Sequence, residues 1–143
     1  MAYQKVLVAV DVAAESNAII EKALAVAGDA PVGVVHVLEP AYFYYGLEPG
    51  IGAIPDNLEQ ELLAQAGAAL KELGDRHSIP AEHQYLERGH APTQVLRLAE
   101  DTETDLIVVG SHGRHGLRLL LGSTANAVLH GAKCDVLAVR VKE

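Results

Sequence analysis

The sequence predicts a doubly wound α/β domain with a parallel sheet, and three observations lead to that fold class. Short β-branched runs alternate with longer segments of helical periodicity along the whole chain. Half of the 143 residues are hydrophobic, and the chain holds only one Phe and no Trp, so its core must be mainly aliphatic. Such strands suit a sheet that helices cover on both faces. The length fits one compact domain, so we expect a single domain over residues 1–143 with five strands.

The first part of the chain predicts a strand, a helix and a second strand. A β-branched run over 6–10 is typical of a strand that is buried on both faces. Apolar residues then recur at helical spacing between 19 and 27, and Ser16 is expected to cap that helix. A second aliphatic run predicts a strand over 32–38.

Periodicity is lost between residues 39 and 55, a segment that is rich in Pro and Gly and contains the aromatic run 42–45. A segment of this length without a pattern is usually functional in a compact domain. Its aromatic run has two alternative roles, a lid over a bound base or a patch for a partner. Asp56 can cap the next helix, which has an apolar face over 58–73, and a more polar run over 81–87 predicts an edge strand.

The last part of the chain predicts two more helices and two more strands. Pro92 opens the third helix, and the β-branched run 105–109 predicts the fourth strand. A glycine-rich segment over 110–123 follows, and then a short helix over 124–130. The final strand, over 136–141, should lie at an edge of the sheet.

Charge and cysteine content narrow the classes of function. The net charge is −8 and the pI is near 5.3, and so acidic a surface repels the backbone of a nucleic acid. Cys134 is the only cysteine, which leaves no disulfide framework and no zinc quartet, so we expect a packed small side chain there. No targeting segment and no run long enough to cross a bilayer is recognised. We therefore expect a cytoplasmic protein without nucleic-acid or membrane partners.

Residues suited to a ligand site follow several of the predicted strands. In open parallel sheets ligands bind beyond the carboxyl ends of the strands, where the strand order reverses. Asp11 follows the first strand, the segment 39–55 follows the second, and Gly110 follows the fourth. These positions predict one site along a single edge of the sheet.

Two glycine clusters in this region suit a phosphate group. The first is VGSHGRHG at 109–116, where glycines let the backbone turn tightly and bring its N–H groups to a ligand. The second, Gly122-Ser123-Thr124, opens a helix whose free N–H groups and dipole favour an anion, and its hydroxyl groups add donors. The alternative is a glycine-rich connection that ends in a Ser/Thr helix cap.

With the strands around them, these glycines resemble the pattern of the universal stress protein family. The family has Gly-x-x-Gly, a spacer of nine residues and Gly-Ser/Thr, and Gly110, Gly113 and Gly122-Ser123 match it with a spacer of eight. A loop around Gly116 is expected to absorb the missing residue. The resemblance covers essentially the whole chain, and its other matches are Asp11 and the runs 34–37 (VVHV), 105–110 (DLIVVG) and 134–139 (CDVLAV).

The resemblance implies the strand order 3-2-1-4-5 and an ATP site. Asp11 would meet the ribose, the main chain of Val37 would touch adenine, and Gly110 would lie along the ribose. The nucleotide-binding set that it implies is Asp11, Val37, Val109, Gly110, Gly113, Gly122, Ser123 and Thr124, the last four at the phosphates. Any Mg²⁺ would be held by the phosphates and water. Arg114 either contacts a phosphate or faces water.

Competing motifs are weaker. No Lys stands beside Ser123, so the segment is not a P-loop, and Gly-x-Ser-x-Gly is absent. His90, His112 and His115 lack a supporting carboxylate at a defined spacing, so no protein-held metal is expected.

Three functions remain, and the leading one is a nucleotide-responsive stress module that binds ATP. It carries no fast chemistry, because no general base stands near the phosphate cradle. A slow ATP hydrolase is the second. The third is a nucleotide-free dimeric interaction protein, because residues 1–11 resemble the A-type branch of the family, whose members lack the glycine motif. The resemblance also implies a homodimer through the strand 136–141.

Overall fold

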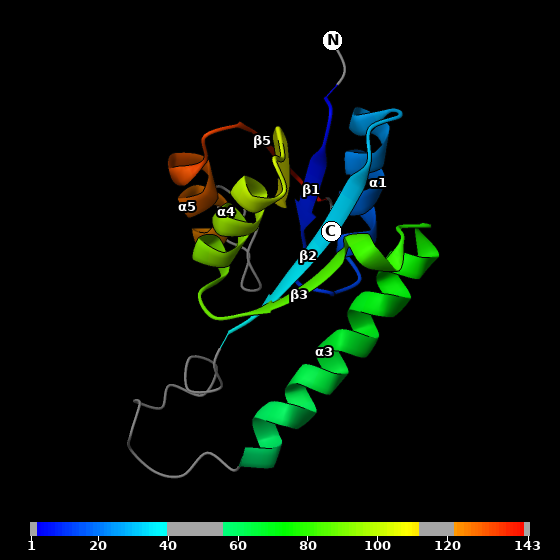
Figure 1. Ribbon diagram of the computed structural model, residues 1–143, viewed down its shortest axis with the longest axis vertical. Coiled ribbons are helices and arrows are strands. Elements are labelled where there is room, and N and C mark those ends of the chain that lie inside the picture. Colours follow the sequence, from blue (N-terminus) through cyan, green and yellow to red (C-terminus); the bar gives the residue numbers. More distant parts are fainter. Residues whose placement is uncertain (1–2, 40–55, 112–121, 142–143) are drawn as a thin grey trace.

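The computed structural model describes residues 3–39, 56–111 and 122–141. They form one five-stranded, all-parallel sheet in the order β3-β2-β1-β4-β5, which confirms the predicted fold class (Figure 1). The strands are β1 (Val6–Ala9), β2 (Val32–Leu38), β3 (Gln84–Arg88), β4 (Leu106–Gly110) and β5 (Asp135–Val139). The helices are α1 (Ser16–Ala27), α3 (Asp56–Arg76), α4 (Ala91–Asp101) and α5 (Ser123–Gly131), with a 3₁₀ turn at Ala81–His83.

Helices cover both faces of the sheet (Figure 1). One apolar cluster joins α1 and α3 to one face, and a second cluster joins α4 and α5 to the other. The chain runs outward from β1 to β2 and β3, then returns past β1 to β4 and β5. The direction of winding therefore reverses between β1 and β4. The crevice at such a switch point is where ligands bind in open α/β sheets.

The core is aliphatic, as the composition predicted. In β1, Val6 and Val8 pack on the α1/α3 face, and Leu7 packs on the opposite face. All seven residues of β2 are buried, because it lies inside the sheet. Burying one such side chain contributes about 1.5–3 kcal/mol. Packing on both faces of the sheet therefore holds the carboxyl ends of its strands in place.

The ends of several elements differ from those predicted. The polar run over 81–87 begins with the 3₁₀ turn, and only then does β3 form, at the sheet edge as expected. The last strand ends at Val139 and is the other edge. The prediction that Ser16 caps α1 is wrong. Glu15 is the cap residue, while Ser16 is the first helical residue and is fully buried.

Cys134 lies just before β5 and is half-buried against the α4/α5 cluster. Burial raises the pKa of its thiol, with smaller contributions from Asp135 and Asp105. A thiol of that kind stays protonated at neutral pH and is a poor nucleophile. Its position agrees with the expected role as a packed small side chain. None of the helices in the described ranges is both long and apolar enough to cross a membrane.

Candidate functional site

The carboxyl edge of the sheet brings together the ends of β1, β2, β4 and β5. The amide of Val10, just beyond β1, donates to the carbonyl of Val35 in β2 (2.9 Å). The amide of Ser111, just beyond β4, donates to the carbonyl of Val139 in β5 (2.8 Å). Asp11 and Gly110 therefore lie at the ends of neighbouring strands, on the two sides of the switch point.

Asp11 is exposed, and its side chain closes the turn that leads into α1. Its Oδ1 accepts hydrogen bonds from the amide of Ala13 and from the hydroxyl of Ser16, both at 3.2 Å. Among the described residues nothing donates to its Oδ2. The carboxylate therefore has one oxygen that holds the turn and one that a ligand hydroxyl can reach.

The main chain of Val37 is left open where β1 ends. Alternate residues of a strand direct their main-chain polar groups to the same side, so Val37 faces β1 just as Val35 does. In a continued ladder the carbonyl of Val10 would accept the amide of Val37. That carbonyl instead accepts the ring Nδ1 of His36 (2.9 Å). The N–H and C=O of Val37 thus have no partner in the described part of the chain.

His36 has the Nδ1 proton, because a carbonyl oxygen can only accept. The ring is only 5% exposed. It is held between β2 and the end of β1 by its bond to the carbonyl of Val10. Sequence reasoning assigned no role to His36, although a polar residue within an apolar strand was a usable signal.

The end of β4 holds the start of α5. The carbonyl of Ser111 accepts the amide of Gly122 (2.7 Å), and Gly122 is the cap residue of α5. That amide is therefore already bonded and is not a free donor. Gly122 has φ −61° and ψ 158°, which any residue adopts, so the backbone conformation does not require glycine there.

The N-terminus of α5 presents amides that have no partner in the described part of the chain. No side chain caps this helix, and the first amides of a helix have no partner within it. In α5 these belong to Ser123, Thr124 and Ala125, since the amide of Asn126 already bonds the carbonyl of Gly122. Ser123 is exposed and Thr124 half-buried, so their hydroxyls add to the set. The alternative of a Ser/Thr cap is not what forms here.

The hydroxyl of Ser111 is a further polar group of this region. The residue is 8% exposed, and its Oγ has no hydrogen-bond partner among the residues that the structure describes. A buried hydroxyl without a partner is uncommon in a folded protein. It lies next to the residues that fix the start of α5, and sequence reasoning assigned it no role.

The structure brings together most of the predicted site residues at the carboxyl ends of the strands. Those that lie there are Asp11, Val37, Gly110, Gly122, Ser123 and Thr124. Val109 is 3% exposed, and its side chain packs in the same cluster as that of Val37. It therefore lies beneath the site as support. Gly113 and Arg114 lie outside the described residues, as do His112, His115 and the aromatic run 42–45.

Within the described ranges no three His, Cys, Asp or Glu side chains are grouped in a way that could hold a metal ion. His90 stands before α4, and its Nδ1 contacts the hydroxyl of Thr93 (2.9 Å). Glu39, which follows β2, accepts a hydrogen bond from the amide of Ala91 at the start of the same helix (3.3 Å). Both side chains therefore serve the N-terminus of α4.

The model of the universal stress protein family matches residues 2–140. The chain belongs to this family. Two universal stress protein A homologs of Coxiella burnetii are close in sequence. Homolog 1 is 46% identical over the whole of both chains. Homolog 2 is 43% identical over 98% of this chain and 97% of its own.

Solved structures share the fold of this universal stress protein. The hypothetical protein MJ0577 has a TM-score of 0.82 at 20% identity, over 100% of this chain and 99% of its own. A universal stress protein solved in complex with cAMP has a TM-score of 0.69 at 26% identity, over 99% and 100% of the two chains. The first likeness concerns the fold alone. The second concerns a relative that binds an adenine nucleotide.

Proposed function

We propose that this chain binds an adenine nucleotide, with ATP as the leading ligand, and acts as a nucleotide-responsive stress module. The observation that carries the proposal is the convergence of unpaired groups at the switch point. The main chain of Val37, the Oδ2 atom of Asp11 and the amides at the start of α5 all lack partners among the described residues. Each of the three suits a different part of a nucleotide.

The base would be read by the main chain of Val37. One N–H and one C=O, both open, match the alternating acceptor and donor atoms on the edge of adenine. The carbonyl of Val10, which would accept the amide of Val37 in a continued ladder, bonds the ring of His36. The apolar side chains of Val37 and Val109 lie beneath, in the packed cluster under α4 and α5.

The sugar would bind Asp11, since a carboxylate at a strand end is the usual acceptor for a ribose hydroxyl in α/β folds. The phosphates would bind the amides and hydroxyls of Ser123 and Thr124, helped by the dipole of α5. Neutral donors of this kind need no basic patch, which fits a chain of net charge −8. Mg²⁺ would come with the phosphates and keep most of its waters.

The relative in complex with cAMP supports the ligand class. Adenine and a free 2′-hydroxyl are common to cAMP and ATP, so a site that reads the base and the sugar accepts either. The amides of α5 favour the nucleotide with more phosphate charge. For this reason ATP is the leading ligand of this chain. A slow hydrolysis would need a base, and Asp11, the carboxylate that follows β1, is assigned to the sugar.

The proposal is tested by calorimetry with ATP and adenosine on the wild type and on Asp11→Ala. We expect the wild type to bind both, ATP more tightly. Asp11→Ala should weaken both by about ten-fold or more, because a hydrogen bond to a charged group contributes about 1.5–3 kcal/mol. A loss confined to ATP would put Asp11 near the phosphates and favour the hydrolase.

A nucleotide-free dimeric interaction protein is the second candidate. The observation that favours it is the likeness to the universal stress protein A homologs, at 46% and 43% identity, together with residues 1–11 of A-type character. The absence of a calorimetric signal with millimolar ATP and adenosine would favour this candidate over the first.

Both candidates include a homodimer through β5. This strand is an edge of the sheet, and its outer side has no partner in the described part of the chain. Pairing with a second copy about a two-fold axis would cover both edges at once. We propose that the protein acts in the cytoplasm, since a chain with one cysteine lacks the disulfide framework that is typical of small secreted domains.

A further inference from the structure

The turn between β1 and α1 is closed by a ring of three hydrogen bonds. Oδ1 of Asp11 accepts from the amide of Ala13, and the carbonyl of Ala13 accepts from the amide of Ser16 (3.0 Å). The hydroxyl of Ser16 then returns to Oδ1 of Asp11 (3.2 Å). Ser16 is fully buried, so its hydroxyl has no water to bond instead. The ring fixes the orientation of the Asp11 carboxylate, and the hydroxyl of Ser16 reaches that carboxylate from the buried side.

Val12, inside this ring, has φ +57°. A β-branched residue rarely adopts this left-handed conformation, which persists only when its surroundings impose it. The bond from the amide of Ala13 to Oδ1 of Asp11 spans Val12 and is one of the contacts that hold the turn in this conformation. A strained turn that the site carboxylate itself holds will relax if that carboxylate rotates.

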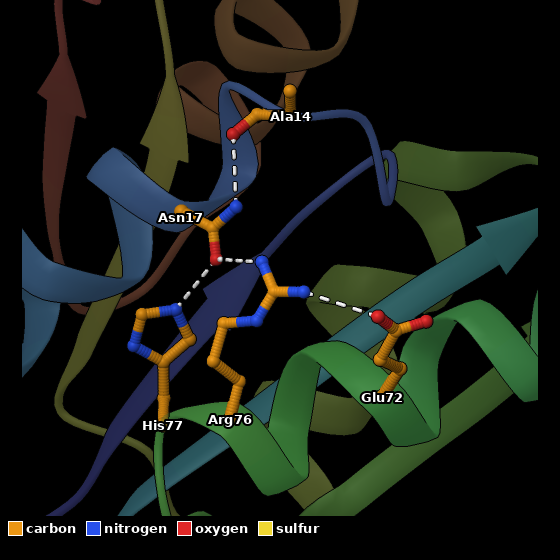
Figure 2. A network of polar contacts seen from close by, with 5 residues as sticks. All are labelled: Ala14, Asn17, Glu72, Arg76 and His77. Carbon is orange, nitrogen blue, oxygen red and sulfur yellow. Dashed lines mark hydrogen bonds and ion pairs between the residues drawn. The ribbon is translucent and has the colours of Figure 1, made fainter.

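A second layer of contacts holds the same turn from outside (Figure 2). The side-chain amide of Asn17 donates to the carbonyl of Ala14 (3.1 Å), which leaves its Oδ1 as an acceptor. Nε2 of His77, just beyond the end of α3, donates to that oxygen at 2.8 Å. Arg76 reaches the same oxygen at 3.5 Å and pairs with Glu72 at 3.1 Å. The end of α3 is thereby tied to the first turn of α1.

We infer that Ser16 is a positioning residue for sugar recognition, and that the clamp formed by Asn17 and His77 supports it. Ser16 occupies Oδ1 of Asp11 and so leaves Oδ2 as the one oxygen that can accept a ribose hydroxyl. The inference rests on the proposed nucleotide binding and adds to it a cause of selectivity for ribose over deoxyribose. We assign the 2′-hydroxyl to this oxygen, because it is the ribose hydroxyl that both cAMP and ATP leave free.

The test compares the affinities of ATP and 2′-deoxy-ATP by calorimetry. The wild type should prefer ATP by about ten-fold or more, because the lost hydrogen bond is to a charged acceptor. Ser16→Ala removes one of the two bonds to Oδ1 and leaves only that from the amide of Ala13, so the carboxylate is held less firmly and the preference should fall to about two- to three-fold. In an Asp11→Ala background the same change should have no further effect, because Ser16 acts only through that carboxylate.

Thr102→Ala is the matched control for Ser16→Ala. The hydroxyl of Thr102 donates to the carbonyl of Leu98 (2.7 Å) at the end of α4, near the opposite edge of the sheet. Its removal also costs a partly buried hydrogen bond, so it should lower stability and leave the preference for ATP unchanged. A general loss of stability is thereby separated from a change in sugar recognition.

The clamp formed by Asn17 and His77 is tested with a separate variant and a separate control. His77→Ala removes the 2.8 Å bond to Asn17 and should reduce the preference for ATP by about two-fold. Lys71→Ala breaks an exposed ion pair with Asp75 one turn earlier on α3 and should leave the preference as it is.

The outcomes separate this inference from the proposed function. A wild type that binds neither nucleotide overturns both. A wild type that binds ATP, while Ser16→Ala keeps the full ten-fold preference, overturns the positioning role of Ser16 and leaves the proposed function standing. An additive effect of Ser16→Ala and Asp11→Ala would likewise contradict the inference, because Ser16 would then act on the sugar by another route.

Discussion

At the scale of single residues, the candidate site consists of groups without a partner in the described ranges of the chain. The main chain of Val37 is one of them, and the carbonyl of Val10 that faces it bonds the ring of His36. Asp11 has one open oxygen because Ser16 and Ala13 occupy the other. Asp11 could be chosen as a candidate from the sequence because it follows a strand, whereas the role of Val37 came from the resemblance to the family. Their buried partners could not be predicted, because a polar residue within an apolar stretch gives no sign of which distant atom it bonds.

Asp105, at the amino end of β4, is another carboxylate that accepts main-chain amides, and these bonds lead to a prediction about pH. Its two oxygens accept the amides of Gln4 and Lys5, both at 2.9 Å. These bonds lower the pKa of Asp105, since they favour the charged form. A depressed pKa adds stability that is present above the unfolded value of about 3.9 and is lost as pH falls through the folded pKa.

Asp105→Asn should therefore lose less stability than the wild type when the pH is lowered from about 5 to about 2. Urea unfolding at a series of pH values and one protein concentration measures this. Asp101→Asn, which removes an equal charge at the end of α4, is the control and should follow the wild type. Parallel curves for Asp105→Asn and the wild type would show that the amide bonds do not depend on the charge.

At the scale of elements, the alternation of strands and helices could be predicted because continuous apolar runs mark the buried strands and helical spacing of apolar residues marks the helices. The run 32–38 became β2 without change, since a fully buried strand is apolar at every position. The ends were less predictable. The predicted start of α1 was wrong because the side chain of Ser16 points inward and bonds Asp11. In the sequence, a serine that caps a helix cannot be told from one that bonds a neighbouring side chain. The cap of α5 became Gly122 because its amide bonds the end of β4.

The start of α5 gives a prediction that separates phosphate from base and sugar. Gly122→Val places a branched side chain where a phosphate must approach the helix, and should weaken ATP binding while adenosine binding stays the same. Ser123→Ala should cost ATP binding less, about 1–2 kcal/mol, because the backbone amides remain. Calorimetry with both ligands measures this, with circular dichroism to verify the fold. An unchanged affinity of Gly122→Val for ATP would place the phosphates elsewhere.

At the scale of the whole molecule, β5 offers an edge for a second copy. The carbonyl of Val139 accepts from Ser111 in β4, so by alternation the main chain of Ala138 faces outward. Val139 itself packs partly against its own core, so a charge there would disturb the fold as well as the edge. A test of the dimer is cleaner at Ala138.

Ala138→Pro removes one outward N–H and leaves the ladder with β4 in place, which edge strands tolerate. We expect the wild type to be a dimer at tens of micromolar and Ala138→Pro to be a monomer, as measured by light scattering. Ala138→Ser keeps the N–H and should remain a dimer. A monomeric wild type at that concentration, or a dimeric Ala138→Pro, would rule out pairing through β5.

The most direct measurement of the central claim is native mass spectrometry of the wild type after equilibration with millimolar ATP. The account predicts one ATP bound to each chain, with or without Mg²⁺, because each copy has its own switch point between β1 and β4. Asp11→Ala and Gly122→Val should each reduce that occupancy. A spectrum in which the wild type carries no nucleotide at millimolar ATP would contradict the account and leave the nucleotide-free interaction protein in its place.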